Sequence, residues 1–333
     1  MVVKTLYYGK KIYTNNLLKL NLYYILYMTI KKISPERVES ILGIDLSDEI
    51  KNRINDFNMT YTELSKEERD EYILKVMNVL NSDITVSGKH RIEEWEKGWG
   101  ENFNKFKESG NIEDLIPRYH SKYDIVRWDG DVVKPTNPNF DYKIHICLID
   151  TILHHYSKDM NNVYEFGCGP GYHLIRLFNH NNELNITGCD WAKSSQSIIN
   201  TINETLSYDI KSHNFDFFNP DFNLNFGEKS LIYTVAALEQ VGENFTKFID
   251  FLMDKKPDLC IHFEPIDELL DENKLIDNLS IKYFRKRNYL KGFLPYLENL
   301  EKEGKIEIIK KQRIYSGSFF IEGHSLIIWR IKK

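Results

Sequence analysis

The sequence predicts an α/β fold in which a mostly parallel sheet with an antiparallel last strand follows an N-terminal helical module. From residue 159 onward, short apolar runs alternate with helical patterns, which is typical of a parallel sheet covered by helices. Residues 34–110 carry a helical pattern instead. The last two apolar runs, 306–312 and 325–331, have no helical pattern between them, so we expect them to pair antiparallel at one sheet edge.

The N-terminal module, residues 30–116, should contain three or four helices. Ser34 and Pro35 offer a cap and a first-turn proline, and Ser65 with Glu68 forms a capping box. Trp95 and Trp99 are four residues apart and would share one helix face, which we interpret as packing against a neighbour.

Residues 1–29 are predicted to be a leader or a poorly ordered segment. The apolar run 17–30 follows three lysines, as in a signal peptide, but it lacks a cleavage pattern. Lys19 and Asn21 interrupt it, and it is shorter than the roughly 20 residues that cross a bilayer. A leader ahead of a start near Met28, an ordered packing segment and a membrane anchor all remain open.

Residues 117–158 are predicted to form a lid or linker and a connecting helix. Turn formers collect at Asp129-Gly130-Asp131 and at two prolines, and a helical pattern follows over 142–156. The domain from 159 to 333 then begins. Its first five strands are expected at 162–166, 185–189, 210–216, 230–236 and 259–263.

A glycine-rich turn follows the first of these strands, in the run Glu165-Phe166-Gly167-Cys168-Gly169-Pro170-Gly171. Glycines there allow positive φ and close approach of a ligand, and the next helix offers free N–H groups. The spacing excludes a dinucleotide fingerprint, because its third glycine would fall on Tyr172 or Leu174. No Gly-Lys-Ser/Thr follows, so a phosphate P-loop is excluded too.

Acidic residues also end the next two strands. Asp190 lies where a carboxylate can bind ribose hydroxyls, although it could also cap the next helix. Asp216 and Phe217 could accept from and stack on an adenine, or Asp216 could form a turn before Pro220.

With these motifs, residues 160–333 resemble the class I S-adenosylmethionine-dependent methyltransferases, whose sheet is Rossmann-like. The resemblance implies that Glu165, Gly167, Gly169 and Gly171 hold the methionine part of the cofactor. Asp190 would hold the ribose, and Asp216 with Phe217 the adenine. Their neighbours Cys168 and Trp191 are included among the cofactor-binding residues. The segment 95–99 is similar to bacterial methyltransferases found with surface-carbohydrate genes.

Methyl transfer requires alignment and, for some acceptors, a base, which should lie at the carboxyl ends of the strands. The candidates are Glu239, His262 and Glu264. His262 and Glu264 share a strand face and could act together, or His262 could be an interior histidine and Glu264 a helix-entry residue.

The basic run 282–291 could bind an anionic acceptor through Arg285, Arg287 and Tyr289, or it could be a solvated helix face. Arg127 and Trp128 could cover the donor or the acceptor, and packing is the alternative for Trp128.

The net charge of -5 disfavours a nucleic-acid partner, and four cysteines without a C-x-x-C pair indicate reduced thiols in a cytoplasmic protein. No spacing of metal ligands is present, and no membrane partner is expected. We therefore expect an enzyme that methylates a small molecule or a carbohydrate, phosphorylated or not. Another transferase of this type, such as an aminopropyl transferase, and a non-catalytic scaffold are the alternatives.

Overall fold

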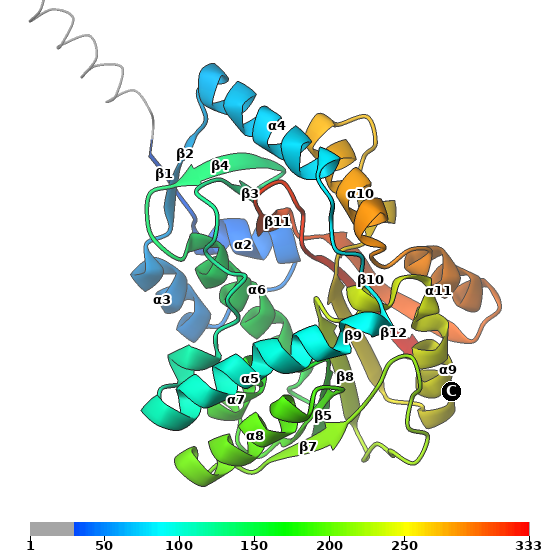
Figure 1. The fold of residues 1–333 in the computed structure, drawn as a ribbon. Coiled ribbons are helices and arrows are strands. Elements are labelled where there is room, and N and C mark those ends of the chain that lie inside the picture. The colour runs from blue at the N-terminus through cyan, green and yellow to red at the C-terminus, as the bar shows by residue number, and fades with distance from the viewer. Residues whose placement is uncertain (1–29, 333) are drawn as a thin grey trace, which may run out of the picture.

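A seven-stranded sheet forms the centre of the computed structural model, which describes residues 30–332 (Figure 1). The predicted leader, residues 1–29, lies outside the described residues. The strand order is β10-β12-β9-β8-β5-β6-β7. The strands are β5 (Asn162–Phe166), β6 (Asn185–Asp190), β7 (Ile210–Asn214), β8 (Ser230–Val235), β9 (Leu259–Glu264), β10 (Ile306–Arg313) and β12 (Ser325–Ile331).

Strand directions agree with the prediction. β5 to β9 pair in parallel, whereas β12, the last strand of the chain, pairs antiparallel with both β9 and β10. β12 lies between these two strands, so β10 forms the edge. The predicted antiparallel pair at one sheet edge is therefore confirmed.

Helices cover both faces of the sheet. On one side, α6 (Phe140–Tyr156), α7 (Tyr172–His180) and α8 (Lys193–Leu206) share a core with the strand residues Leu231 and Ile261. On the other, α9 (Thr246–Lys255) and α11 (Phe293–Lys302) share a second core with Ile232 and Cys260. Successive strand residues point to opposite faces, so these near-continuous apolar strands supply both cores.

The N-terminal module contains α2 (Pro35–Leu42), α3 (Asp48–Phe57), α4 (Lys66–Asn81) and α5 (Ile92–Ser109), within the expected number of helices. The predicted caps are present: Ser34 Oγ accepts from Arg37 N at 3.2 Å, and Ser65 and Glu68 form the capping box. Because caps depend on neighbouring residues only, the sequence indicates them directly.

A second sheet of five short strands was not predicted. Its order is β1-β2-β4-β3-β11, from β1 (Lys31–Lys32), β2 (Thr60–Glu63), β3 (Val126–Trp128), β4 (Asp131–Pro135) and β11 (Ser316–Ser318). Strands of two to five residues are too short to show a period of two. β11 comes from the C-terminal part of the chain and pairs with β3, so the predicted lid region is partly strand.

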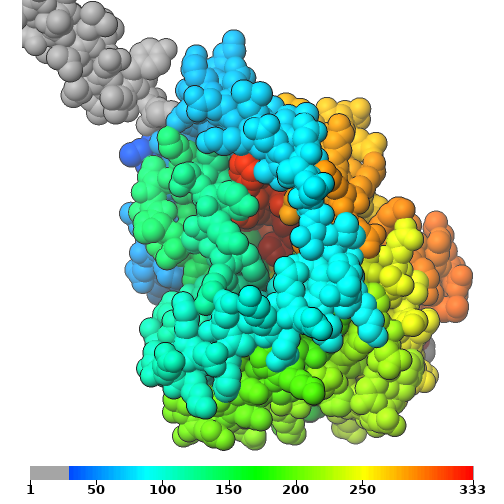
Figure 2. Space-filling model, viewed as in Figure 1, coloured from blue at the N-terminus to red at the C-terminus, as the bar shows by residue number. Residues whose placement is uncertain are grey.

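The surface is hollowed between the N-terminal module and the sheet domain. Figure 2 shows this hollow bordered by the cyan chain leading into α5 and by green residues of the second sheet, with red C-terminal residues at its floor. The remaining helix α10 (Leu275–Arg287) packs against α4, and η3 (Leu238–Phe245) follows β8. Across residues 30–332, no helix has the length and apolar character needed to cross a membrane.

Candidate functional site

The glycine turn between β5 and α7 has the backbone that the sequence predicted. Gly167, Gly169 and Gly171 have φ of +75°, +50° and +73°. A Cβ at Gly167 would lie 2.3 Å from Ala237 Cβ, and one at Gly169 would lie 2.9 Å from the Trp99 ring. The turn therefore needs glycine both for positive φ and because other segments pack closely against it.

Glu165, at the end of β5, is held from both sides. Tyr233 Oη donates to Glu165 Oε2 at 2.9 Å, and His173 Nδ1 lies 3.0 Å from Oε1. The residue is buried and lines a cavity with about 450 Å³ of empty space, together with Gly167, Cys168 and Gly169. A fixed, buried carboxylate beside a cavity suits a cationic group of a ligand.

Asp190, at the end of β6, connects the glycine turn to the next helix. Its Oδ2 accepts from Gly169 N at 2.9 Å, and its Oδ1 accepts from Ala192 N at 2.8 Å. Burial raises the pKa of Asp190 to about 6, although these two hydrogen bonds lower it. A carboxylate has about four lone-pair positions, so these two hydrogen bonds do not use all of them. Asp190 is thus no simple helix cap, because Ala192 occupies that position.

A second cavity, with about 490 Å³ of empty space, adjoins the first at Gly167. Asp190, Trp191 and Phe217 line it, as the predicted grouping of cofactor residues requires. Asp216 points elsewhere: Oδ1 accepts from Phe218 N at 2.8 Å and Oδ2 pairs with Lys89. The structure thus supports Phe217 in this grouping and favours the turn interpretation for Asp216.

Trp95 and Trp99 of α5 line both cavities, a position that their sequence pattern did not predict. Their rings stack with centroids 5.4 Å apart. Glu96 docks α5 onto the N-terminus of α8 by accepting from Ser194 N at 3.1 Å, and Arg91 Nη1 donates to Gln240 at 3.0 Å. The two tryptophans therefore form a roof over the cavities. Their i,i+4 spacing predicted a shared helix face without indicating a cavity.

Glu239 is the best placed of the three candidate bases. It is buried in η3, where Gln240 Nε2 donates to its Oε1 at 2.7 Å, and Gln240 itself lines the larger cavity. Burial, with a smaller contribution from the charge of Glu264, raises the pKa of Glu239 to about 8. A carboxyl group with a pKa near neutrality is suited to accept a proton from a substrate.

His262 and Glu264 do not act as a pair. His262 is fully buried between Phe293 and Trp329, and its Nδ1 lies 3.1 Å from Thr234 Oγ1. Burial lowers the pKa of His262 to about 3. The Glu264 carboxylate accepts from the backbone N–H groups of residues 237, 238 and 239 at 3.0 to 3.1 Å. Glu264 thus positions the turn that carries Glu239. The structure favours structural roles for His262 and Glu264 over the predicted role of each as a base.

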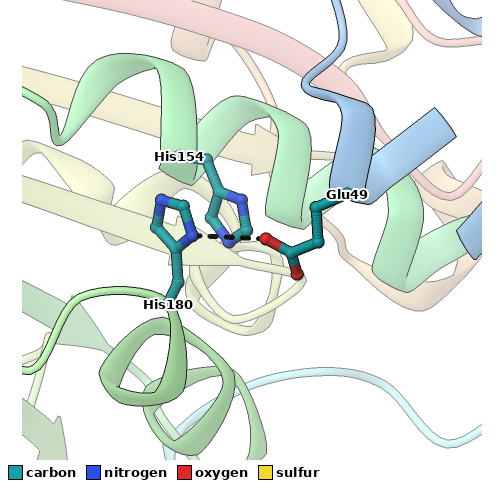
Figure 3. Close-up of side chains that lie close together, drawn as sticks. All are labelled: Glu49, His154 and His180. Atoms are coloured by element: carbon teal, nitrogen blue, oxygen red, sulfur yellow. Dashed lines mark ion pairs between the residues drawn. The ribbon is translucent and has the colours of Figure 1, made fainter. Parts of the chain in front are cut away.

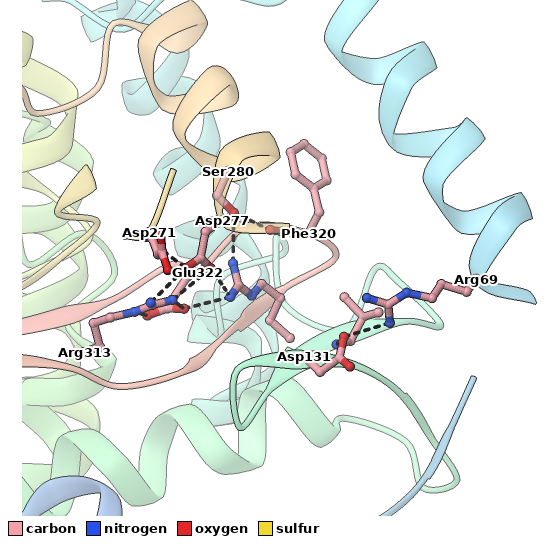
Figure 4. A network of polar contacts seen from close by, with 10 residues as sticks. Arg69, Asp131, Asp271, Asp277, Ser280, Arg313, Phe320 and Glu322 are labelled. Atoms are coloured by element: carbon pink, nitrogen blue, oxygen red, sulfur yellow. Dashed lines mark hydrogen bonds and ion pairs between the residues drawn. The ribbon is translucent and has the colours of Figure 1, made fainter. Parts of the chain in front are cut away.

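Arg127 and Trp128 cannot cover a ligand, because each is only 1% exposed in β3. Arg127 Nη2 pairs with Asp277 at 2.7 Å and with Glu322 at 3.0 Å. Arg313 pairs with the same two carboxylates (Figure 4). This buried network joins β3 to α10 and to the segment before β12, which makes Arg127 a structural residue.

The predicted anion-binding residues divide into two environments. Arg285 is exposed and pairs with Glu272 at 2.8 Å. Arg287 is buried beside Tyr289, with its guanidinium 5.1 Å from the ring centre, and its charge influences Glu239. Only Arg287 and Tyr289 therefore lie near the candidate base.

Comparisons with known proteins give structural likeness alone. No family model matches the chain, and no curated protein matches its sequence. Among solved structures, a small RNA methyltransferase, HEN1, is 16% identical (TM-score 0.42), with 55% of this chain and 24% of that chain covered. Human N-acetylserotonin methyltransferase in complex with SAM is 13% identical, with a TM-score of 0.39. The match covers 59% of this chain and 55% of that chain.

The O-methyltransferase NcsB1 from neocarzinostatin biosynthesis is likewise 13% identical, with a TM-score of 0.39. The match covers 72% of this chain and 69% of that chain. The chain thus covers less than two thirds of the first two of these proteins. The fold assignment comes from strand order and strand direction in the chain itself. A mostly parallel, seven-stranded sheet with an antiparallel last strand is the fold of the class I S-adenosylmethionine-dependent methyltransferases.

Proposed function

We propose that this protein is an S-adenosylmethionine-dependent methyltransferase that acts on a hydroxyl group of a small molecule or carbohydrate. The observation that carries the proposal is the pair of adjoining cavities beneath Trp95 and Trp99. They lie where β5, β6 and β8 end, and open α/β sheets bind ligands at that edge.

The two carboxylates that line the cavities suit two parts of S-adenosylmethionine, the methyl donor. Glu165 would pair with the cationic amino group, while His173 and Tyr233 keep its carboxylate in place. Asp190 would accept from the ribose hydroxyls with its remaining lone pairs. Bound there, the donor would supply a methyl group on a positively charged sulfur.

The roof offers a further polar contact. Trp95 Nε1 is buried and has no hydrogen-bond partner among residues 30–332. Buried polar groups are nearly always bonded, so an unpaired indole N–H in the wall of a cavity favours a ligand that accepts there. The absence of a Cβ at Gly169 lets the Trp99 ring approach the turn and close the roof.

For the acceptor, we propose Glu239 as general base and Arg287 with Tyr289 as its surroundings. A hydroxyl group needs a base when it attacks the methyl carbon in line with the sulfur. Tyr119, which is 45% exposed and lines the smaller cavity, offers an aromatic face on which a sugar could stack. The hollow in Figure 2 would be the route by which the acceptor enters.

The proposal is tested first by calorimetry. S-adenosylmethionine and its demethylated product should bind with micromolar affinity and raise the melting temperature, because a ligand that binds the native state stabilises it. NAD serves as the control. If NAD bound to folded protein and neither of the two methionine nucleosides did, the proposal would be wrong.

Turnover is tested with labelled donor and a panel of sugars, sugar phosphates and small phenols. Glu239→Gln should lower methyl transfer by about 10²- to 10⁴-fold, the usual contribution of a general base, with donor affinity nearly unchanged. Transfer at the parent rate by this variant would exclude Glu239 as the base while leaving the donor site intact.

A further inference from the structure

Two imidazoles and one carboxylate from three helices meet between the N-terminal module and the sheet domain. Glu49 comes from α3, His154 from α6 and His180 from the last position of α7 (Figure 3). One possible ligand atom from each lies within 4.8 Å of the other two. No second trio of His, Cys, Asp or Glu side chains in residues 30–332 meets this condition.

The two imidazoles lie face to face beside the carboxylate. Their rings stack with centroids 3.3 Å apart and planes 5° from parallel. Two nitrogens bound to one tetrahedral zinc ion are roughly 3.3 Å apart, and imidazole lone pairs lie in the ring planes, so the two rings would turn out of their parallel stack to bind a shared ion. His154 is 6% exposed, and its Nδ1 has no hydrogen-bond partner in the described part of the chain.

The carboxylate is already oriented by a neighbour. Arg53 pairs through Nη2 with Glu49 Oε1 and through Nη1 with Asp150. Glu49 Oε2 faces His180 Nδ1 at 3.6 Å, too far for a hydrogen bond but with room to receive an ion. An outer residue that holds a ligating carboxylate in place is usual around protein metal sites.

We propose that Glu49, His154 and His180 form a binding site for a divalent transition metal ion, with Zn²⁺ as the expected occupant. Imidazole and carboxylate ligands suit zinc, and three protein ligands leave a fourth position for water. Water can reach this position because the side chains of Glu49 and His180 are 53% and 29% exposed. The ion would fasten α3 of the module to α6 and α7, independently of the proposed methyl transfer.

Metal binding is measured on the untagged full chain after removal of metal with a chelator. Titration with ZnCl₂ should show one site per chain, Zn²⁺ should raise the melting temperature, and Co²⁺ should give the visible absorption of a low-symmetry four-coordinate ion. His180→Ala and Glu49→Gln should each weaken zinc affinity by about 10- to 100-fold or more.

His213→Ala is the matched control. His213 also pairs with a carboxylate, that of Asp221 at 3.1 Å, and its side chain is 31% exposed, close to the value for His180. Its removal should leave zinc affinity unchanged. Absence of saturable zinc binding by the parent chain, or equal binding by His180→Ala and the parent, would show that the trio is only a packed ion pair.

Discussion

Replacement of Glu239 by glutamine tests whether the acidic group at the candidate site is held protonated by the fold. Glutamine keeps the shape of the side chain and an oxygen that can accept from Gln240 Nε2, but it cannot ionise. The pKa of the Glu239 carboxyl is raised from 4.5 to about 8, chiefly by burial. The native state therefore retains a proton that the unfolded chain has already lost.

The sign and size of the effect follow from proton linkage. A folded pKa above the unfolded value contributes stability that is fully present below about pH 4.5 and is lost as the pH rises to about 8. Between pH 6 and the folded midpoint near pH 8, about 1.7 units at 1.36 kcal/mol each correspond to about 2 kcal/mol. Because glutamine cannot ionise, the free energy of unfolding of the variant relative to the parent should rise by about this number of kcal/mol between pH 6 and pH 8.

The assay is a series of thermal melts of parent and variant, without ligand, from pH 5 to pH 9. The difference in melting temperature should widen from pH 5 upward in favour of Glu239→Gln and level off only near pH 9. A difference that stays constant from pH 6 to pH 9 would show that Glu239 ionises in the folded protein with an ordinary pKa, and its assignment as the base would lose its physical basis.

Three further predictions concern the donor and acceptor sides. Asp190→Ala should weaken donor binding by roughly 10- to 150-fold, which equals about 1.5 to 3 kcal/mol for lost hydrogen bonds to a charged group. A variant that lost stability yet bound the donor like the parent would exclude the ribose role. Gly167→Ala should lose donor binding or stability, since its Cβ would be 2.3 Å from Ala237 Cβ. Gly98→Ala, whose Cβ would have nothing within 4 Å, should be neutral or stabilise α5 by about 1 kcal/mol. Calorimetry and thermal melts of both variants decide this. Arg287→Gln should raise the acceptor KM, and Arg285→Gln should not, because only Arg287 lies near Glu239; equal KM values in steady-state kinetics would mean that the basic run does not touch the acceptor.

Local sequence patterns were sufficient for the sheet domain. The strands at 162–166 and 325–331 occur where the apolar runs predicted them, because a buried strand needs a continuous run of apolar residues. The glycine turn was predictable for a similar reason, since positive φ at successive positions demands glycine whatever surrounds them. The caps at Ser34 and Ser65 also depend only on residues within one turn.

The second sheet could not be predicted in this way. β11 and β3 lie nearly two hundred residues apart in the chain and are three residues each, so neither has a pattern of its own. Their pairing buries Arg127 and Trp128, which the sequence presented as residues of a surface segment. Burial of an arginine is tolerated there because Asp277 and Glu322 compensate its charge.

The sequence by itself determined the order of strands and helices in the seven-stranded sheet domain, the glycine turn and the acidic residues Glu165 and Asp190, because each depends on residues close together in the chain. The tertiary structure decided which of these groups share a cavity, that Trp95 and Trp99 roof it, and that Gln240 of its lining, rather than His262, is bonded to Glu239. It also decided the meeting of Glu49 with His154 and His180. Burial and contacts between distant segments set the pKa values and partners of these side chains, and neither property is present in a local pattern of residues.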